Sequence, residues 1–309
     1  MFLKKGDLVD IISPASSITK HEFENIEKFL HSQGLCTRFH MAKELLLEKK
    51  PSSHIPAFSA KKRFEQLRFA LENKESKAVW CVRGGYGSAD IIPFLQTLPK
   101  IAQTKMFIGF SDITSLAIFL NQQWNFEIIY APMLNQLAKN QLSSASKRKI
   151  LQFIFGKKPQ LNYNISAQNN CKNAKNITAE IVGGCLSVAA SHFATKNQID
   201  WQNKILFLED IDESGERLDR YFCQIVEVIK STKSYPKAIL LGNFYFQITS
   251  RNKKKNIALA NAKLIKRLHE ASIDIPIFVE NSHCLGHAKN MMPLIIGRAA
   301  QIKDGKLKQ

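Results

Sequence analysis

The chain has 309 residues, 45% of them hydrophobic, which is enough to bury one large core or two ordinary ones, and two domains are expected. No apolar run reaches the roughly 18 residues of a membrane-spanning helix, and the short apolar segment after Lys4 and Lys5 is interrupted at Asp10, so we expect neither a membrane span nor export. The 44 Lys and Arg residues exceed the 26 Asp and Glu residues, but no aromatic-interleaved basic motif accompanies the net charge of +18, so no specific nucleic-acid partner is expected.

In the first half of the chain, apolar strands alternate with amphipathic helices. Strands are predicted at 8–12, 78–82 and 106–110 from their apolar runs. Helices are predicted between them from apolar residues at helical spacing, and Gly34 ends the first of these helices. This alternation predicts a mostly parallel sheet flanked by helices, whose functional loops lie at the carboxyl ends of the strands.

Two of these strands lead into loops with chemical character. The strand at 78–82 continues into the glycine-rich loop at 83–87, where the main chain can approach a substrate closely or simply make a tight turn. The strand at 106–110 leads into Ser111 and a helix, so the hydroxyl projects toward the N–H groups and the positive end of a helix dipole, as a nucleophile requires. The segment is not a full G-x-S-x-G elbow because Ile113 replaces the last glycine, and a serine that only caps the helix is the alternative.

The second half of the chain begins with a second alternating series. Before it, a stretch rich in Asn and Lys lacks periodic apolar residues, which predicts a linker or an extended crossing segment. We therefore predict two α/β domains, at 1–156 and 179–309, joined by a linker at 157–178. The later strands are predicted at 179–182, 205–208, 238–241 and 275–279, and the later helices at 186–193, about 217–229 and 257–268.

This second series offers an acid and a base for the serine. Glu209 and Asp210 end one strand, and neighbours on a strand point in opposite directions, so both cannot serve equally. His287 follows the last strand, and His283 is an alternative base that lies closer to that strand. A serine, an acid and a histidine that each follow a strand are the parts of a nucleophilic triad, which we expect at the interface between the domains.

An ordered set of short motifs runs through nearly the whole chain, from Gly6 to about Gly297. The motifs are RGGYG at 83–87, GFSDIT at 109–114, GG-x-LS at 183–187, FLED at 207–210 with RLDR at 217–220, and GH at 286–287. Together they resemble the LD-carboxypeptidase family of serine peptidases. That family includes the muramoyltetrapeptide carboxypeptidases of murein recycling and the microcin C immunity peptidases.

The resemblance implies a triad of Ser111, Glu209 and His287 in a cytoplasmic homodimer without a metal or cofactor. The six cysteines show no C-x-x-C spacing, so the sequence itself indicates neither a zinc site nor a disulfide framework. One position departs from the family, because Cys185 follows the paired glycines where Asn is common.

The remaining site residues lie in the two loops of the first half. The backbone N–H groups of Asp112 and Gly85 are candidates for the oxyanion hole. The carboxylate of Asp112 is expected to support the start of its own helix. Gly84 and Tyr86 are candidates for substrate binding. The Arg83 guanidinium can hold a terminal carboxylate bidentately, and a structural ion pair is the alternative role.

Three functions remain open at this point. The first is a serine carboxypeptidase that cleaves the L-centre-to-D-alanine bond of murein tetrapeptides in peptidoglycan recycling. The second uses the same triad on a peptidyl or aminoacyl nucleotide. The third is a basic polyanion-binding protein without catalysis, although the dense basic runs, at 61–63 and 147–149 for example, are short and are interpreted as solvated surface.

Overall fold

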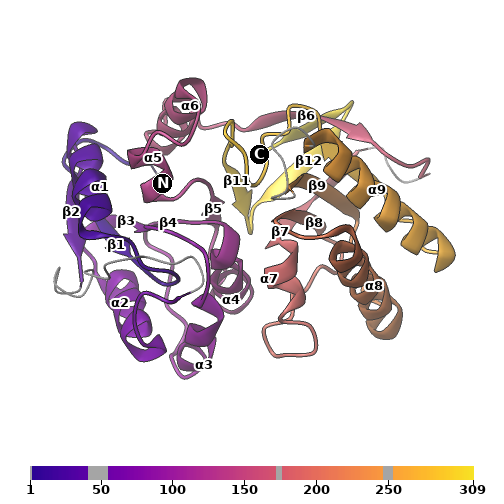
Figure 1. Cartoon of the computed structure of the whole chain (residues 1–309), viewed down its shortest axis with the longest axis horizontal. Helices are drawn as coiled ribbons and strands as arrows, with labels where there is room; N and C mark the ends of the chain where they lie inside the picture. The colour runs from indigo at the N-terminus through magenta and orange to yellow at the C-terminus, as the bar shows by residue number, and fades with distance from the viewer. Residues whose placement is uncertain (1, 41–54, 172–175, 246–252) are drawn as a thin grey trace. The chain divides into compact units, whose positions relative to one another are not determined.

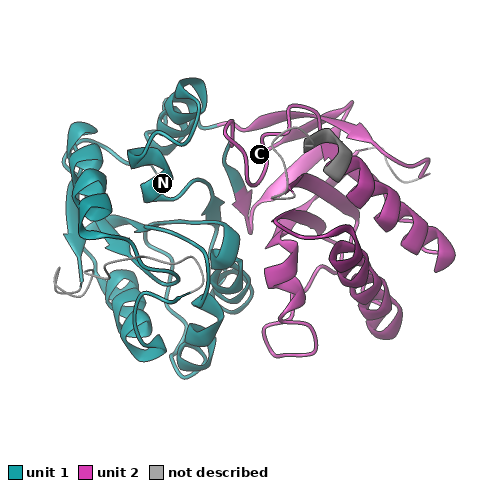
Figure 2. Cartoon of the chain, viewed as in Figure 1, with its two compact units in different colours: residues 1–159, 292–294 teal, residues 160–291, 295–309 magenta. Residues whose placement is uncertain are grey.

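A computed structural model of the chain describes residues 2–40, 55–171, 176–245 and 253–309. The chain divides into two compact units (Figure 2). The first unit contains residues 1–159 and 292–294, and the second contains residues 160–291 and 295–309. Each unit combines helices with a sheet, so the chain consists of two α/β domains.

A six-stranded sheet forms the centre of the first unit (Figure 1). Its strands are β1 (Leu8–Ile12), β2 (Cys36–Phe39), β3 (Ser76–Cys81), β4 (Met106–Ile108), β5 (Ile128–Tyr130) and β11 (Leu294–Ile296), and of β11 only Leu294 belongs to this unit. They lie in the order β11-β5-β4-β3-β1-β2, and the pairs from β5 to β2 are parallel. Its helices are α1 (Lys20–Ser32), α2 (Ala60–Glu72), α3 (Ile92–Leu95), α4 (Thr114–Trp124), α5 (Leu134–Ala138) and α6 (Ser144–Ile154). The predicted mostly parallel sheet with flanking helices is confirmed.

The sequence pattern explains how this unit is layered. β1 and β3 are almost entirely buried, as strands in the middle of a parallel sheet are when helices cover both faces. Figure 1 shows α1 and α5 on one side of the sheet and α2 and α3 on the other. α1 begins at a capping box formed by Thr19 and Glu22, and Gly34 follows its end with a φ of 77°.

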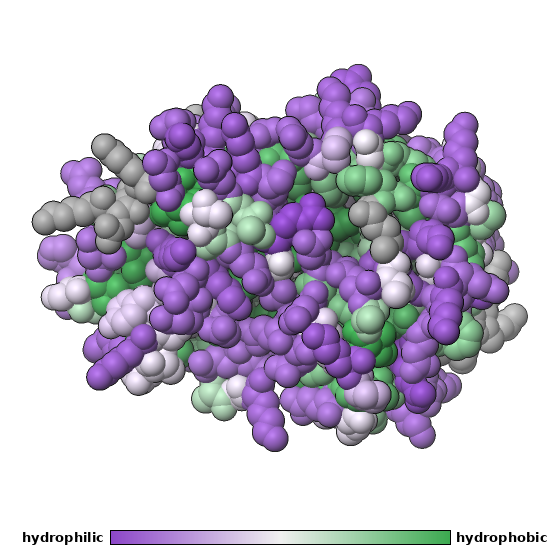
Figure 3. Space-filling view, turned by 180° about the vertical axis from the view of Figure 1, so that it is seen from behind, coloured by the Kyte–Doolittle hydropathy of each residue, from purple (hydrophilic) through white to green (hydrophobic). Residues whose placement is uncertain are grey.

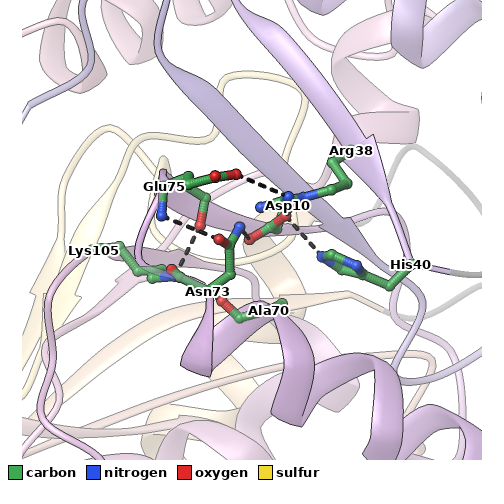
Figure 4. Close-up of polar contacts among 8 residues, drawn as sticks. Asp10, Arg38, His40, Ala70, Asn73, Glu75 and Lys105 are labelled. Carbon is green, nitrogen blue, oxygen red and sulfur yellow. Dashed lines mark hydrogen bonds and ion pairs between the residues drawn. The ribbon is translucent and has the colours of Figure 1, made fainter.

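A buried polar network surrounds Asp10 of β1, the strand next to the edge strand β2 (Figure 4). The Asp10 carboxylate, in the middle of β1, lies within hydrogen-bond distance of Arg38 Nε (3.2 Å), His40 Nε2 (2.8 Å) and Asn73 Nδ2 (2.8 Å). Burial acts to raise the pKa of Asp10, but these hydrogen bonds outweigh it and hold the pKa below its usual value. Lys105 is also buried and donates to the main-chain carbonyl of Asn73. The network thus ties β1 and β2 to the end of α2.

In the described part of the second unit, seven strands form a sheet that closes on itself. In chain order they are β6 (Asn162–Ala167), β7 (Ile177–Cys185), β8 (Ile205–Ile211), β9 (Ala238–Tyr245), β10 (Ile277–Glu280), β12 (Ala299–Lys303) and β13 (Lys306–Lys308). The order β10-β6-β13-β12-β7-β8-β9 returns from β9 to β10. The strands β7 to β10 are parallel neighbours, and β6, β12 and β13 pair antiparallel. The helices α7 (Leu186–Ala190), α8 (Gly215–Thr232) and α9 (Lys253–Glu270) connect the parallel strands.

Some elements differ in extent from the sequence prediction. β4 and α7 end slightly earlier than predicted. β8 continues to Ile211 because β9 runs beside it, so Glu209 and Asp210 lie inside the strand rather than after it. β6 lies in the stretch at 157–178, where its alternating burial is carried by too few apolar residues to stand out in the sequence. Residues 172–175 of that stretch lie outside the described ranges.

Hydrophilic side chains cover most of the face shown in Figure 3, and the hydrophobic residues on it lie in patches between them. This distribution fits the interpretation of the positive charge as largely solvated surface. Within the described ranges, no helix combines the length and the apolar character that crossing a membrane requires.

Candidate active site

Ser111 lies in a strained turn between β4 and α4. It opens a single 3-10 turn at Ser111–Ile113, and its backbone φ is 63°, in the left-handed region that non-glycine residues rarely adopt. Its N–H donates to the Tyr130 hydroxyl (3.3 Å). The N-cap positions of the turn and of α4 are Phe110 and Ile113, so Ser111 is not the residue that caps the helix. A serine forced into this conformation between a strand and a helix is typical of a nucleophile elbow.

The first glycine of this elbow is required by packing. A Cβ on Gly109 would lie 2.9 Å from Ile113 Cγ2 and 3.1 Å from Cys81 Sγ. The Ile113 side chain therefore fills the space beside Gly109 that a larger residue would need. This packing explains how an elbow forms although its last position is Ile113 instead of glycine.

The glycine-rich loop lies directly against the serine. A Cβ on Gly84 would be 3.1 Å from Ser111 Cβ and 3.3 Å from its Oγ, which is tighter than ordinary side-chain contacts. Gly85 and Gly87 have φ values of 98° and 115°, so the loop needs glycine for its backbone as well. Tyr86 is exposed, and its N–H donates to Ser16 Oγ (3.0 Å). A side chain at Gly84 would therefore press against Ser111.

Arg63 holds this loop from within the unit. Its guanidinium donates to the carbonyl of Gly87 (2.6 Å) and the carbonyl of Pro14 (3.3 Å), and it pairs with Asp90 (2.9 Å). The side chain is 1% exposed. The interpretation of the basic run at 61–63 as solvated surface is therefore wrong for Arg63, because folding supplies it with buried acceptors.

Asp112 connects the two loops. Its carboxylate accepts a hydrogen bond from Ser88 N (2.8 Å), and Ser88 Oγ donates to the Asp112 carbonyl. Burial raises the pKa of Asp112. The carboxylate lies in the first turn, where its charge favours the helix N-terminus, and the turn also places it against the residues that follow the glycine-rich loop. Its backbone N–H follows the serine, as in other elbows.

Arg83 begins the glycine-rich loop and is partly buried. Its Nη1 donates to the carbonyl of Ser17 at 3.5 Å. The carboxylate that it influences electrostatically is Glu22, but Glu22 is paired directly with Lys139. Within the described ranges no ion pair includes Arg83, so its guanidinium keeps donors for an anion.

In the second unit, Glu209 and His287 form a hydrogen-bonded pair. Glu209 is fully buried in β8, and its Oε2 lies 2.7 Å from His287 Nδ1 and accepts from His287 N (3.0 Å). A carboxylate at Nδ1 favours the tautomer with hydrogen on Nδ1, which makes Nε2 the basic nitrogen. The His287 side chain is 13% exposed. The pair has the geometry of an acid that orients a base.

Two glycines make this contact possible. A Cβ on Gly286, whose φ is 87°, would lie 2.5 Å from Glu209 Oε2. A Cβ on Gly242, in β9, would lie 2.7 Å from the Leu285 carbonyl and 3.1 Å from Glu209 Cβ. The loop that carries His287 therefore approaches β8 and β9 more closely than would be possible with a side chain at position 242 or 286.

We expect Gly286→Ala to lower kcat about 100-fold, because the new methyl group must displace Glu209 or His287 by roughly 1 Å. Gly305→Ala is the matched control. Gly305 also has a positive φ of 69°, but its Cβ would meet only the Ile165 carbonyl, at 3.5 Å. Both variants should lose about 1–2 kcal/mol of stability from the left-handed backbone, and only Gly286→Ala should lose activity. Equal kcat values for the two would contradict this account of the loop.

Asp210 points away from the histidine. Its carboxylate accepts from Ser187 N (2.6 Å), Ser187 Oγ (3.2 Å) and Ile211 N (2.8 Å), and Cys185 Sγ lies 3.3 Å away. Burial, with the neighbouring Glu209 as the next cause, raises the pKa of Asp210 to about 6. Asp210 thus organises the turn from β7 into α7, and Cys185 belongs to that turn.

His283 is anchored separately from His287. Its carbonyl accepts from Asn243 Nδ2 (2.9 Å) and its N–H donates to the carbonyl of Glu280 (3.3 Å). The Glu280 carboxylate accepts from the N–H groups of Ser282 and Cys284, both at 2.7 Å. The sequence prediction did not include Glu280 or Asn243, although Glu280 ends the apolar strand β10. Glu280 and Asn243 both hold the loop that carries His287.

The electrostatics of His287 predict the pH dependence of activity. Burial acts to lower its pKa, but the charge of Glu209 and the hydrogen bond to it outweigh burial, so the pKa lies above 6.5. A protonated imidazole cannot accept a proton, so kcat/KM should fall tenfold per pH unit below this pKa. The acid limb of the pH profile should therefore be centred above pH 6.5. A limb centred below that value would contradict the assignment of His287 as the base.

The raised pKa of His287 also makes the stability of the protein depend on pH, in the opposite direction to its activity. Because the pKa of His287 is raised in the folded state, its contribution to stability is fully present below pH 6.5 and is lost as the pH rises through the folded pKa. His287→Asn should therefore destabilise the protein more at pH 6 than at pH 9, as denaturant unfolding would measure.

Within each unit, the structure thus brings predicted site residues together: Gly84 and Ser111 in the first, and Glu209 and His287 in the second. Across the described ranges, His, Cys, Asp and Glu side chains form no group of three or more that could hold a metal ion.

Comparisons with known proteins agree with this picture. Residues 9–131 match the family model of the LD-carboxypeptidase N-terminal domain, and residues 178–302 match that of the LD-carboxypeptidase C-terminal domain. A Rickettsia conorii protein that is named as a carboxypeptidase is 32% identical over 252 residues, which cover 81% of this chain and 75% of that protein. The murein tetrapeptide carboxypeptidase of Pseudomonas aeruginosa is 25% identical over 312 residues, covering 97% of this chain and 94% of that protein. A solved structure of MccF in complex with glutamyl sulfamoyl guanosine has a TM-score of 0.77 at 17% identity, covering 99% of this chain and 96% of that one, and shares its fold.

Proposed function

Because the chain belongs to the LD-carboxypeptidase family, we propose that it is a cytoplasmic serine peptidase that removes the terminal D-alanine from murein tetrapeptides. The observation that carries this proposal is the buried Glu209 carboxylate at His287 Nδ1, which makes Nε2 the basic nitrogen. The strained Ser111 turn supplies a nucleophile of the type such a base activates. The Pseudomonas aeruginosa relative, named as a murein tetrapeptide carboxypeptidase, supports the choice of substrate.

In the proposed reaction, Ser111 Oγ attacks the carbonyl before the terminal residue while His287 Nε2 accepts the hydroxyl proton. Glu209 holds the imidazole and stabilises it once it is protonated. His287 then gives the proton to the leaving amine, and water repeats the sequence on the acyl-enzyme. The N–H groups of Asp112 and Gly85 hold the oxyanion, and each donor would lower the barrier by about 3–4 kcal/mol.

The terminal carboxylate of the substrate must also be held, and Arg83 is the residue we propose for it. Arg83 has no carboxylate partner in the described ranges, and it starts the loop that lies against Ser111. Gly84 leaves space for the substrate backbone, and Tyr86 offers an exposed ring beside it. We propose that the active protein is a homodimer, as in the family.

A stereochemical assay tests this function. We expect cleavage of a tetrapeptide ending in D-alanine, and rates about 100-fold lower for the same peptide ending in L-alanine, because exchange of methyl and hydrogen displaces the carbonyl by roughly 1 Å. Amidation of the terminal carboxylate should reduce the rate comparably in the wild type and have little further effect in Arg83→Gln. Released alanine is measured for all three peptides.

Equal rates on the D-ending, L-ending and amidated peptides would contradict the carboxypeptidase proposal. The ratio of the cleavage rates of the free-acid and amidated peptides could also be the same in Arg83→Gln and in the wild type. That result would show that Arg83 does not bind the terminal carboxylate, without contradicting the proposed reaction.

A second candidate function uses the same triad on a peptidyl or aminoacyl nucleotide. The fold shared with MccF, whose solved structure holds glutamyl sulfamoyl guanosine, favours including it. Cys185, which replaces a common Asn beside the acid turn, is the position where the substrate preference could differ. Hydrolysis of an aminoacyl sulfamoyl nucleoside, without release of D-alanine from a tetrapeptide, would select this second function.

A further inference from the structure

A basic cavity in the first unit has no part in the proposed reaction. It has a volume of about 720 Å³, in the range of sites for small ligands, and it is lined by one face of α6, the end of α1 and nearby loops. Lys147 and Arg148, from a basic run noted in the sequence, face it from α6, and Lys5 and Lys157 complete its set of cations. No acidic residue is among the described residues that line it.

Three of the cations have no protein partner for their charge. The side chains of Lys5, Arg148 and Lys157 make no hydrogen bond or ion pair with another residue in the described ranges, and all three are exposed. The stem of Lys5 lies next to Gly34, since a Cβ on Gly34 would be 3.0 Å from Lys5 Cγ. The positive charges around this cavity repel each other. A bound anion would reduce that electrostatic repulsion.

The fourth cation is fixed by neutral groups. Lys147 Nζ donates to the carbonyl of Leu137 (2.9 Å) and to Asn140 Oδ1 (3.0 Å), and it lies 4.6 Å from the centre of the Phe29 ring. Burial lowers its pKa, as expected for an ammonium group that has no anionic partner among the described residues. Lys147 thus adds a positioned charge that its protein contacts do not neutralise.

We propose that this cavity binds a small anion carrying two or more linked phosphate groups. Phosphate oxygens point in several directions, so one ligand can accept hydrogen bonds from Lys5, Arg148 and Lys157 on different walls, while a carboxylate presents only two oxygens in one plane. The Arg148 guanidinium can bind a phosphate bidentately. Beside these charges, Phe155 offers an apolar wall for the organic part of a phosphate ester.

The test measures pyrophosphate binding to the full chain by titration calorimetry at about 50 mM salt, where charge interactions are weakly screened. The double variant Arg148→Gln with Lys157→Gln removes two lining charges. Its matched control is Lys149→Gln with Lys158→Gln, which removes two exposed charges at the adjacent positions outside the cavity. We expect one pyrophosphate per chain, binding weakened at least tenfold in the first variant, and a change of less than twofold in the control.

The Ser111→Ala variant separates this site from the active site, because it should bind pyrophosphate as the wild type does whether or not the chain is a peptidase. Absence of saturable binding would overturn the proposal. So would an equal loss in the lining variant and its control, since that result would show diffuse attraction of polyanions to the surface. Single-stranded DNA could also bind more tightly than pyrophosphate and be weakened equally by both double variants. That result would indicate that the positive surface binds nucleic acid instead.

Discussion

Ser111→Ala is expected to lower kcat about 10⁴-fold or more while the protein remains folded. The hydroxyl is the atom that forms the covalent intermediate, and what remains after its removal is catalysis by the oxyanion donors and by binding alone. We expect alanine to keep the left-handed backbone of the turn, where Ser111 has a φ of 63°, because the change removes only the Oγ atom, so the loss should measure the hydroxyl. The measurement is release of alanine from a D-alanine-ending tetrapeptide, with circular dichroism as the check on folding.

Ser115→Ala is the matched control. It makes the same change at a buried serine four residues further along, in α4, and should leave kcat within a few fold of the wild type. Because a triad acts as a unit, adding His287→Ala to Ser111→Ala should cost little more than the worse single change. Near-normal activity of folded Ser111→Ala would rule out the serine mechanism. If the double variant lost as much activity as the two single losses combined, Ser111 and His287 would not act in the same catalytic step.

Glu209→Gln is expected to lower kcat about 10³-fold or more, although the side chain keeps its shape. Oε2 faces both His287 N and Nδ1, so the amide oxygen of glutamine can still accept those hydrogen bonds, but the negative charge that stabilises the imidazolium is gone. The pKa of His287 should fall as well, because the Glu209 charge is the main cause that raises it. The acid limb of the pH profile should therefore move to lower pH in this variant.

Asp210→Asn is the matched change at the neighbouring position, and it should act on stability. The Asp210 carboxylate accepts hydrogen bonds from Ser187 and Ile211, and an amide must turn a donor toward one of those N–H groups. We expect a loss of about 1–3 kcal/mol in the free energy of unfolding, with kcat less affected than in Glu209→Gln. If Asp210→Asn lost more activity than Glu209→Gln, the two acids would have to exchange roles.

The sequence predicts the α/β class and the positions of most strands of the parallel sheets, because buried parallel strands are short apolar runs that stand out locally. The resemblance to the family implies Glu209, but the residue pattern alone leaves the choice between Glu209 and Asp210 open for a physical reason. Alternation along a strand says that the two side chains diverge, but not which of them faces His287. That outcome depends on the register of β8 against β9 and on the approach of Gly286, and both arise from distant parts of the chain.

The closed sheet of the second unit could not be predicted because its extra strands are weak in the sequence. β6 alternates buried and exposed residues in an Asn-rich stretch, and β12 and β13 are short. Arg63 shows the same limit for a single residue. Three successive basic residues suggest solvated surface, and only the folded chain supplies the carbonyls of Pro14 and Gly87 that Arg63 binds.

The backbone at Ser111 also bears on how related chains evolve. A serine with a φ of 63° costs roughly 1–2 kcal/mol that glycine would not, so selection for stability alone favours its loss. A lineage that no longer needs the reaction is free to accept glycine there and become more stable. Serine or glycine at position 111 of a related chain therefore indicates whether selection has maintained its catalytic activity or only its fold.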